Sequence, residues 1–161
     1  MTQYSAFFYG SLMSKVVLSR VLCGTKVSQH DESLKMNSVK LVPATLKGYT
    51  RSSLKGEEYP AITQTEGQGK VEGVLAQGLT ETDIKALDIF EGDWYQRIPV
   101  QVTSDENGTT FDTNVYLYVG DMQLLTGTDW SFQQFLESGK EQKWLDDRCD
   151  FFDVDNFHHA S

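Results

Sequence analysis

The chain has 161 residues, of which 39% are hydrophobic and 12% aromatic, and 23 acidic against 14 basic residues give a formal charge of −9. These values predict a soluble globular chain of single-domain length. They disfavour nucleic acid and membrane surfaces as partners, because both require clustered lysine and arginine, which this sequence lacks.

Two further features bear on the compartment. The N-terminus shows no basic segment followed by an apolar run, and no stretch approaches the roughly 18 apolar residues that cross a bilayer. The two cysteines, Cys23 and Cys149, are far apart and form no CxxC pair. Cys23 follows an apolar pair near a predicted helix end, which favours a buried thiol over a nucleophile. We therefore expect a cytoplasmic protein.

The first 50 residues predict strands and one helix. Residues 5–9 are short, aromatic and apolar and end at a glycine, which is typical of a central strand. A helix then begins after Ser14 and ends at Gly24. Residues 25–38 are polar without a clear period, so we expect a loop with at most one irregular turn. Residues 39–50, interrupted by a proline and a glycine, predict a strand pair or one long bent strand.

Two hairpins are predicted further along. Residues 59–64 and 70–76 alternate apolar and polar side chains around a Glu-Gly-Gln-Gly segment. Residues 95–103 and 110–119 flank an Asn-Gly pair, which favours a tight turn between two strands.

Two more helices complete the prediction. Thr80 can cap the first, with an acidic residue at the third following position as in a capping box, and Gly92 can end it. The second covers residues 130–145, where aromatic side chains recur at roughly helical spacing after Asp129 as a cap. The acidic, aromatic segment that follows matches no element.

The elements together indicate an α+β fold. Five to seven strands without regular strand–helix alternation argue against a doubly wound sheet. We expect a small, mixed or antiparallel β-barrel with flanking helices. It would form one domain over residues 1–145, followed by a C-terminal tail over residues 146–161.

A carboxylate interrupts the apolar face of the helix that begins at Thr80. With about 100° per residue, Glu91 falls about 20° from Ile84 and 40° from Leu87, which mark the inward face. Asp88 lies on the flank of that face, and Asp83 and Lys85 point away. Desolvation would raise the pKa of the Glu91 carboxyl, as suits a general acid or base. The alternatives are a frayed helix end or an ion pair with one of two arginines, Arg97 or Arg51.

The second candidate is the turn formed by Tyr9, Gly10, Ser11 and Leu12, between a strand and a helix. Glycine permits backbone conformations that other residues resist and lets a ligand come close. Successive amides there can face a carboxylate or an oxyanion, although a plain tight turn is the structural alternative. Ser11 lacks the surroundings of a nucleophilic serine. No His, Cys and acidic set has metal-ligand spacing, and the histidines lie in predicted loop and tail: His30, His158 and His159.

Six blocks in order resemble the γ-glutamylcyclotransferase-like superfamily, in particular its AIG2-like and γ-glutamylamine cyclotransferase branch. They are Phe8-Tyr9-Gly10-Ser11-Leu12, Tyr59-Pro60-Ala61, Val71-Glu72-Gly73-Val74-Leu75, Leu87-Asp88-Ile89-Phe90-Glu91-Gly92, Tyr95-Gln96-Arg97-Ile98-Pro99-Val100 and Val115-Tyr116-Leu117-Tyr118. Their order and approximate spacing match the family from residue 7 to about residue 120.

The resemblance implies a compact β-barrel with one cavity, in which a γ-glutamyl amine, peptide or amino acid cyclises to 5-oxoproline and releases its amine. It assigns the glutamyl moiety to the turn of residues 9–12 and the acid/base role to Glu91. Tyr95, Arg97 and Tyr118 would line the cavity or orient Glu91, with packing roles equally open for the tyrosines. No metal ion or cofactor is implied, the partner is a small γ-glutamyl molecule, and a monomer or weak homodimer is expected. The alternative is a non-catalytic module of the same family that binds a small metabolite or another protein.

Overall fold

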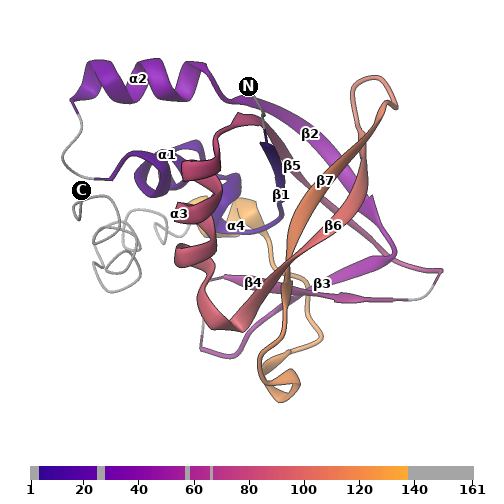
Figure 1. The fold of residues 1–161 in the computed structure, drawn as a ribbon. Coiled ribbons are helices and arrows are strands. Elements are labelled where there is room, and N and C mark those ends of the chain that lie inside the picture. The colour runs from indigo at the N-terminus through magenta and orange to yellow at the C-terminus, as the bar shows by residue number, and fades with distance from the viewer. Residues whose placement is uncertain (1–3, 25–27, 57–58, 66, 138–161) are drawn as a thin grey trace.

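The computed structural model describes residues 4–24, 28–56, 59–65 and 67–137. Figure 1 shows a β-barrel with helices gathered along one side of it. This arrangement confirms the predicted α+β class and the predicted barrel with flanking helices, and of the two alternatives, mixed or antiparallel, the barrel is mixed.

Five strands close the barrel in the order β1-β5-β2-β6-β7. Their bounds are β1 Tyr4–Phe8, β2 Lys40–Lys47, β5 Lys70–Leu79, β6 Tyr95–Ser104 and β7 Thr110–Tyr118. Neighbouring strands are antiparallel except β1 and β7, which close the barrel in parallel with Phe7 opposite Val115. The predicted hairpin around the Asn-Gly pair is confirmed as β6 and β7, with Tyr95 opposite Tyr118 at its open end.

The hairpin predicted for residues 59–64 and 70–76 is wrong. β3 (Tyr49–Ser53) pairs with β4 (Pro60–Gln64) in a separate two-stranded sheet, whereas β5 pairs with β1 and β2. Lys47 stands opposite Lys70, but Tyr49 stands opposite Gln64. The Gly48 amide donates to the Gly69 carbonyl and the Gly48 carbonyl accepts from Thr65, at 3.1 and 2.8 Å. The glycine-rich segment is therefore a corner opposite Gly48, where two bent strands change sheets together.

The helices are α1 (Lys15–Cys23), α2 (Gln29–Asn37), α3 (Glu81–Glu91) and α4 (Phe132–Glu137), with short 3₁₀ turns at Ser11–Met13, Gly92–Trp94 and Met122–Leu124. As predicted, Ser14 caps α1 and accepts a hydrogen bond from Val17, and Gly24 ends it. Helices α1 and α3 pack against each other, and α4 packs against the turn after β1 (Figure 1).

Two predictions about helices need correction. The loop expected over residues 25–38 contains α2, which Ser28 caps through the Asp31 amide; its polar residues lack an apolar period because a single residue, Met36, is buried. Helix α4 begins at Phe132, and its cap contact comes from Ser131, whose hydroxyl accepts from the Gln134 amide. The expected extension to residue 145, like the tail over residues 146–161, lies outside the described residues.

The core has three clusters among the described residues, and the two larger ones lie on opposite faces of β1. Phe7 packs in a cluster made of strand residues and Tyr9, which fills the barrel. Ala6 and Phe8 point the other way, into a cluster shared with α1, α3 and α4. Gly73 is required for this packing, because a β-carbon there would stand 2.2 Å from the Phe8 carbonyl oxygen. Among the described residues, no helix is long and apolar enough to cross a membrane.

Candidate active site

A cavity of about 260 Å³ lies where helix α3 and the turn after β1 meet the strands. Its walls come from the end of β1 and the following turn, the start of β4, the end of α3, the next 3₁₀ turn, the start of β6 and β7. The lining residues are Phe7, Phe8, Tyr9, Gly10, Ser11, Leu12, Tyr59, Pro60, Phe90, Glu91, Gly92, Asp93, Trp94, Tyr95 and Tyr116. The structure thus brings Glu91, the whole predicted turn and Tyr95 to one site, whereas Arg97 and Tyr118 do not line the cavity.

Helix α3 places Glu91 in the cavity wall. The helix begins with the expected capping box, in which Thr80 and Asp83 each accept from the other's amide, and ends at Gly92 with a φ of 74° that favours glycine. Ile84 and Leu87 are buried, so the predicted inward face is correct. Asp83 is also buried, contrary to expectation, because its carboxylate folds back onto the helix start and pairs with Lys35 of α2.

The Glu91 carboxyl has a strongly altered proton affinity. Loss of solvation in the cavity wall, and then the negative charge of Asp88, raise its pKa to about 8. The residue is half-buried and lines the cavity. The proposed ion pairs with Arg97 and Arg51 do not form, because these arginines pair with Asp88 and Asp129 at 3.1 and 2.9 Å. A carboxyl titrating near neutral pH can both accept and return a proton.

Asp88, one helical turn before Glu91 on α3, contacts two strands of the barrel. Its Oδ1 accepts a hydrogen bond from the Tyr116 hydroxyl at 2.8 Å and forms an ion pair with Arg97 Nε at 3.1 Å. Burial and this bond to Asp88 raise the pKa of Tyr116, which therefore stays a hydrogen-bond donor. The helical period places Asp88 on the flank of the inward face, whereas no pattern within β7 assigns a role to Tyr116. Strand alternation could have identified Tyr116, since it puts Tyr116 on the same face of β7 as the candidate Tyr118.

The glycine of the turn is needed for space. The Gly10 backbone has a φ of −127° and a ψ of −140°, so the turn does not use the left-handed region. A β-carbon at this position would stand 2.7 Å from Pro60 Cδ. The Met13 amide donates to the Gly10 carbonyl as the first bond of the 3₁₀ turn. The amides of Ser11 and Leu12 come before the first donor of the 3₁₀ turn, so they have no partner within the turn. No side chain at the cap position accepts from them.

Three tyrosines fix the aromatic wall. The Tyr9 hydroxyl donates to the Tyr116 carbonyl, and the Tyr95 hydroxyl donates to the Pro60 carbonyl at 2.8 Å. Burial first, and then nearby negative charge, raise the pKa of both hydroxyls. Tyr118 is 1% exposed and packs its ring edge-to-face on Tyr95 at 5.7 Å. Tyr95 is therefore part of the cavity wall, and Tyr118 supports it.

The remaining candidates lie elsewhere. Cys23 is half-buried at the end of α1, and burial raises the pKa of its thiol, in line with the predicted structural thiol. Within the part of the chain that the structure describes, no three His, Cys, Asp or Glu side chains form a metal-binding group. Cys149, His158 and His159 lie outside that part.

Comparison with known proteins extends the geometric findings. The profile of the family described as gamma-glutamyl cyclotransferase, AIG2-like matches residues 6–132. AIG2-like protein D of Arabidopsis thaliana is 33% identical over 136 residues, which cover 83% of this chain and 80% of the relative. Protein AIG2 C of the same plant is 28% identical over 132 residues, covering 82% and 72%.

Solved structures agree with this relationship. The solution structure of an Arabidopsis thaliana protein superposes with a TM-score of 0.65 at 27% identity, covering 92% of this chain and 81% of that one. A structure described as gamma-glutamyl cyclotransferase gives a TM-score of 0.54 at 18% identity over 74% and 68% of the two chains, which shows the shared fold. The profile match over most of the chain establishes that this protein belongs to the gamma-glutamyl cyclotransferase, AIG2-like family.

Proposed function

We propose that this protein is a γ-glutamyl cyclotransferase that converts a γ-glutamyl amine, peptide or amino acid to 5-oxoproline and releases the amine. The observation that carries the proposal is that Glu91 and the turn of Tyr9, Gly10, Ser11 and Leu12 line the same cavity. Membership of the family and the altered proton affinity of Glu91 support it.

The reaction suits a small cavity without a protein nucleophile. The α-amine of the substrate attacks its own γ-carbonyl carbon, so both reacting groups belong to one molecule. Holding them in a ring-closing pose removes much of the entropic part of the barrier. Aromatic walls such as Tyr95 and Tyr116, each fixed by a hydrogen bond through its hydroxyl, provide a rigid enclosure for this pose.

Glu91 would move the protons. Its carboxylate accepts one proton from the α-ammonium group, and the freed amine forms the new C–N bond of the ring. As the old C–N bond breaks, protonated Glu91 gives its proton to the leaving nitrogen. The ring nitrogen passes its remaining extra proton to the departing amine, which leaves as an ammonium ion. A pKa of about 8 makes both protonation states of Glu91 accessible near neutral pH.

The turn would provide hydrogen-bond donors. The amides of Ser11 and Leu12 lie ahead of the first bond of the 3₁₀ turn, in the wall of the cavity. They can hold the α-carboxylate or the negative charge that develops on the γ-carbonyl oxygen. One well-placed donor to such a charge contributes roughly 3 kcal/mol to a transition state. The scheme requires no metal ion or organic cofactor.

The exposed part of the lining indicates where the amine would leave. Gly92, Asp93 and Trp94 are exposed, and Trp94 keeps 41% of its surface accessible. The glutamyl part would therefore sit among the buried residues of the turn, with the amine toward these three residues.

The test is release of 5-oxoproline from a panel of γ-glutamyl amines, dipeptides and amino acids. Turnover of at least one class supports the proposal. If every class fails while calorimetry detects 5-oxoproline binding, the cavity is that of a binding module and the catalytic proposal is wrong.

A further inference from the structure

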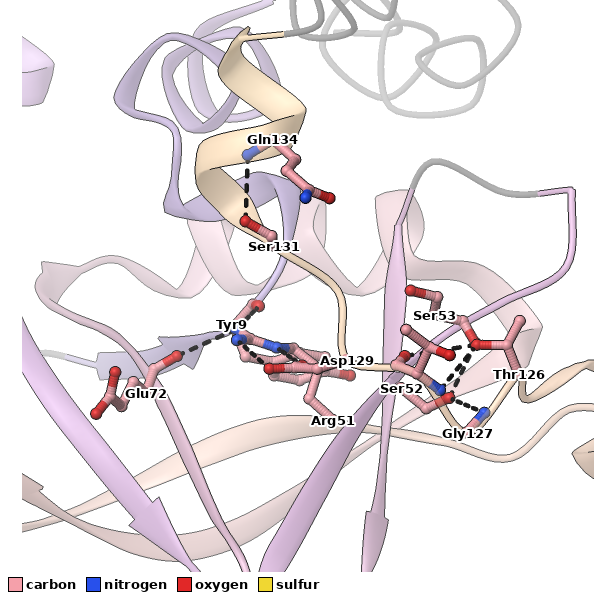
Figure 2. A network of polar contacts seen from close by, with 11 residues as sticks. Tyr9, Arg51, Ser52, Ser53, Glu72, Thr126, Gly127, Asp129, Ser131 and Gln134 are labelled. Atoms are coloured by element: carbon pink, nitrogen blue, oxygen red, sulfur yellow. Dashed lines mark hydrogen bonds and ion pairs between the residues drawn. The ribbon is translucent and has the colours of Figure 1, made fainter.

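Arg51 in the middle of β3 contacts the candidate active site from outside its lining. Its Nη1 donates to the Tyr9 carbonyl at 2.9 Å and to the Glu72 carbonyl of β5 at 3.3 Å. Its side chain is 15% exposed, and it does not line the cavity. Figure 2 shows the guanidinium between Tyr9, Glu72 and Asp129. A cation in this position is directed at the backbone of the turn rather than at the cavity.

The contact to Tyr9 determines the direction of the next amide. A peptide unit is planar and trans, so its N–H points opposite to its carbonyl. Fixing the Tyr9 carbonyl toward Arg51 therefore fixes the Gly10 N–H away from Arg51, and Gly10 lies in the cavity wall. A positively charged donor on the carbonyl also polarises the peptide, which strengthens its N–H as a donor.

The guanidinium is itself held on two sides. Nε and Nη2 donate to the two carboxylate oxygens of Asp129 at 2.9 and 3.4 Å, and the charge lies 5.8 Å from the ring centre of Trp130. Trp130 belongs to the buried cluster that contains Leu12. Arg51 thus contacts the start of the turn at Tyr9, and the ring that it approaches belongs to the same buried cluster as Leu12 at the end of the turn.

The backbone around Asp129 is fixed to β3 beside Arg51. The Ser53 amide donates to the Thr128 carbonyl at 2.8 Å, and the Thr126 amide donates to the Ser53 carbonyl at 3.0 Å. The Gly127 amide donates to the Ser52 hydroxyl at 3.1 Å, as Figure 2 shows. Although the Asp129 side chain is 69% exposed, its anchored backbone keeps the carboxylate within reach of the guanidinium.

We propose that Arg51, held by Asp129, is a positioning residue that fixes the Tyr9–Gly10 peptide so that the amides of the turn face the substrate. The inference rests on the proposed function for its kinetic test and on the geometry alone for its spectroscopic test. Arg51 touches no reacting atom, so it acts through the turn and not on Glu91.

The kinetic test compares Arg51→Met, Arg51→Lys and Asp129→Asn with Lys35→Met. Lys35 pairs with Asp83 between α2 and α3, away from the turn, so its variant controls for loss of a partly buried ion pair. For a γ-glutamyl substrate that the wild type turns over, we expect kcat/KM to fall about ten- to hundredfold in Arg51→Met. Arg51→Lys, which keeps the charge, and Asp129→Asn should fall less, and Lys35→Met should match the wild type at a temperature where all variants are folded.

The pH profile separates positioning from a general loss of structure. In Arg51→Met the midpoint of the rate should stay at the wild-type value, because Glu91 is unchanged. A kcat/KM value in folded Arg51→Met equal to that of the wild type, or an equal loss in Lys35→Met, would overturn the proposal. A shifted midpoint would do the same.

The spectroscopic test requires no turnover and therefore decides the inference even if the proposed function fails. The ¹³C signal of the Tyr9 carbonyl and the ¹⁵N signal of the Gly10 amide report the hydrogen bond directly. We expect both to shift in Arg51→Met and Asp129→Asn, while amides of β6 and β7 keep their positions and Lys35→Met leaves Gly10 unchanged. Unchanged Tyr9 and Gly10 signals in Arg51→Met would contradict the inference.

Discussion

The ring of Pro60 lies against the backbone of Gly10, so that a β-carbon at residue 10 would stand 2.7 Å from Cδ and 3.0 Å from Cγ of that ring. Pro60 begins β4, and its carbonyl accepts a hydrogen bond from the Tyr95 hydroxyl. The proline therefore cannot move without disturbing Tyr95. The turn, β4 and β6 form one rigid wall of the cavity, and any side chain at residue 10 must displace the turn.

We expect Gly10→Ala to destabilise the protein by about 1–3 kcal/mol through overpacking and to reduce kcat/KM. Gly108→Ala is the matched control: Gly108 has a φ of 72° and open space around it, so alanine there costs roughly 1–2 kcal/mol through backbone strain. Denaturant unfolding and steady-state kinetics together check both variants. If Gly108→Ala lost as much kcat/KM as Gly10→Ala, the effect would come from stability and not from the turn.

The charge of Asp88 should tune the pH dependence of Glu91. Asp88 raises the pKa of Glu91 toward its value of about 8, so Asp88→Asn should move the midpoint of the pH–rate profile to lower pH. Arg97→Met removes the cation that pairs with Asp88 and should move the midpoint to higher pH. The two variants provide a test of sign, measured as kcat/KM from pH 5 to pH 10. Shifts in the same direction would show that Asp88 does not act on Glu91 through its charge.

Glu91 should also make stability depend on pH. Its pKa is 4.5 when solvated and about 8 in the fold, so between these values the folded state holds a proton that the unfolded state has lost. The free energy of unfolding therefore falls as pH rises through this window. Each pKa unit corresponds to about 1.4 kcal/mol, and solvent contact of the residue reduces this, so we expect a loss of about 1–3 kcal/mol.

Glu91→Gln should lack this component. Its stability relative to the wild type should increase from pH 5 to pH 8.5, as measured by denaturant unfolding of both proteins at each pH. A difference between the two proteins that is constant over this range would mean that the Glu91 carboxyl does not have a raised pKa in the folded state.

Local patterns in the sequence predicted the parts of the site that depend on one element. The helical period alone placed Glu91 beside Ile84 and Leu87, because α3 is regular from its capping box to Gly92. The strand β1 and its glycine turn followed from a short apolar run and the residue after it. These features need only neighbours in the sequence, and the family blocks then connected them.

Features that depend on partners distant in the sequence were not predicted. The glycine-rich segment after β4 resembles a hairpin turn, but Gly48, far from it in sequence, supplies its hydrogen bonds. Arg51 was weighed only as a partner for Glu91, whereas it pairs with Asp129 and the Tyr9 carbonyl. Asp83 is buried because α2, a helix without an apolar period, brings Lys35 over it. Each of these contacts joins segments that are distant in the sequence, so local propensity does not predict it.

The central claim is that Glu91 carries the proton transfers of a γ-glutamyl cyclotransferase, and the most direct measurement is 5-oxoproline release by the wild type and by Glu91→Gln. The control is Glu81→Gln, the same chemical change at an exposed residue of the same helix. We expect Glu91→Gln to lose at least about a hundredfold in kcat while it still binds 5-oxoproline, and Glu81→Gln to keep wild-type turnover. Equal turnover by Glu91→Gln and the wild type would contradict it.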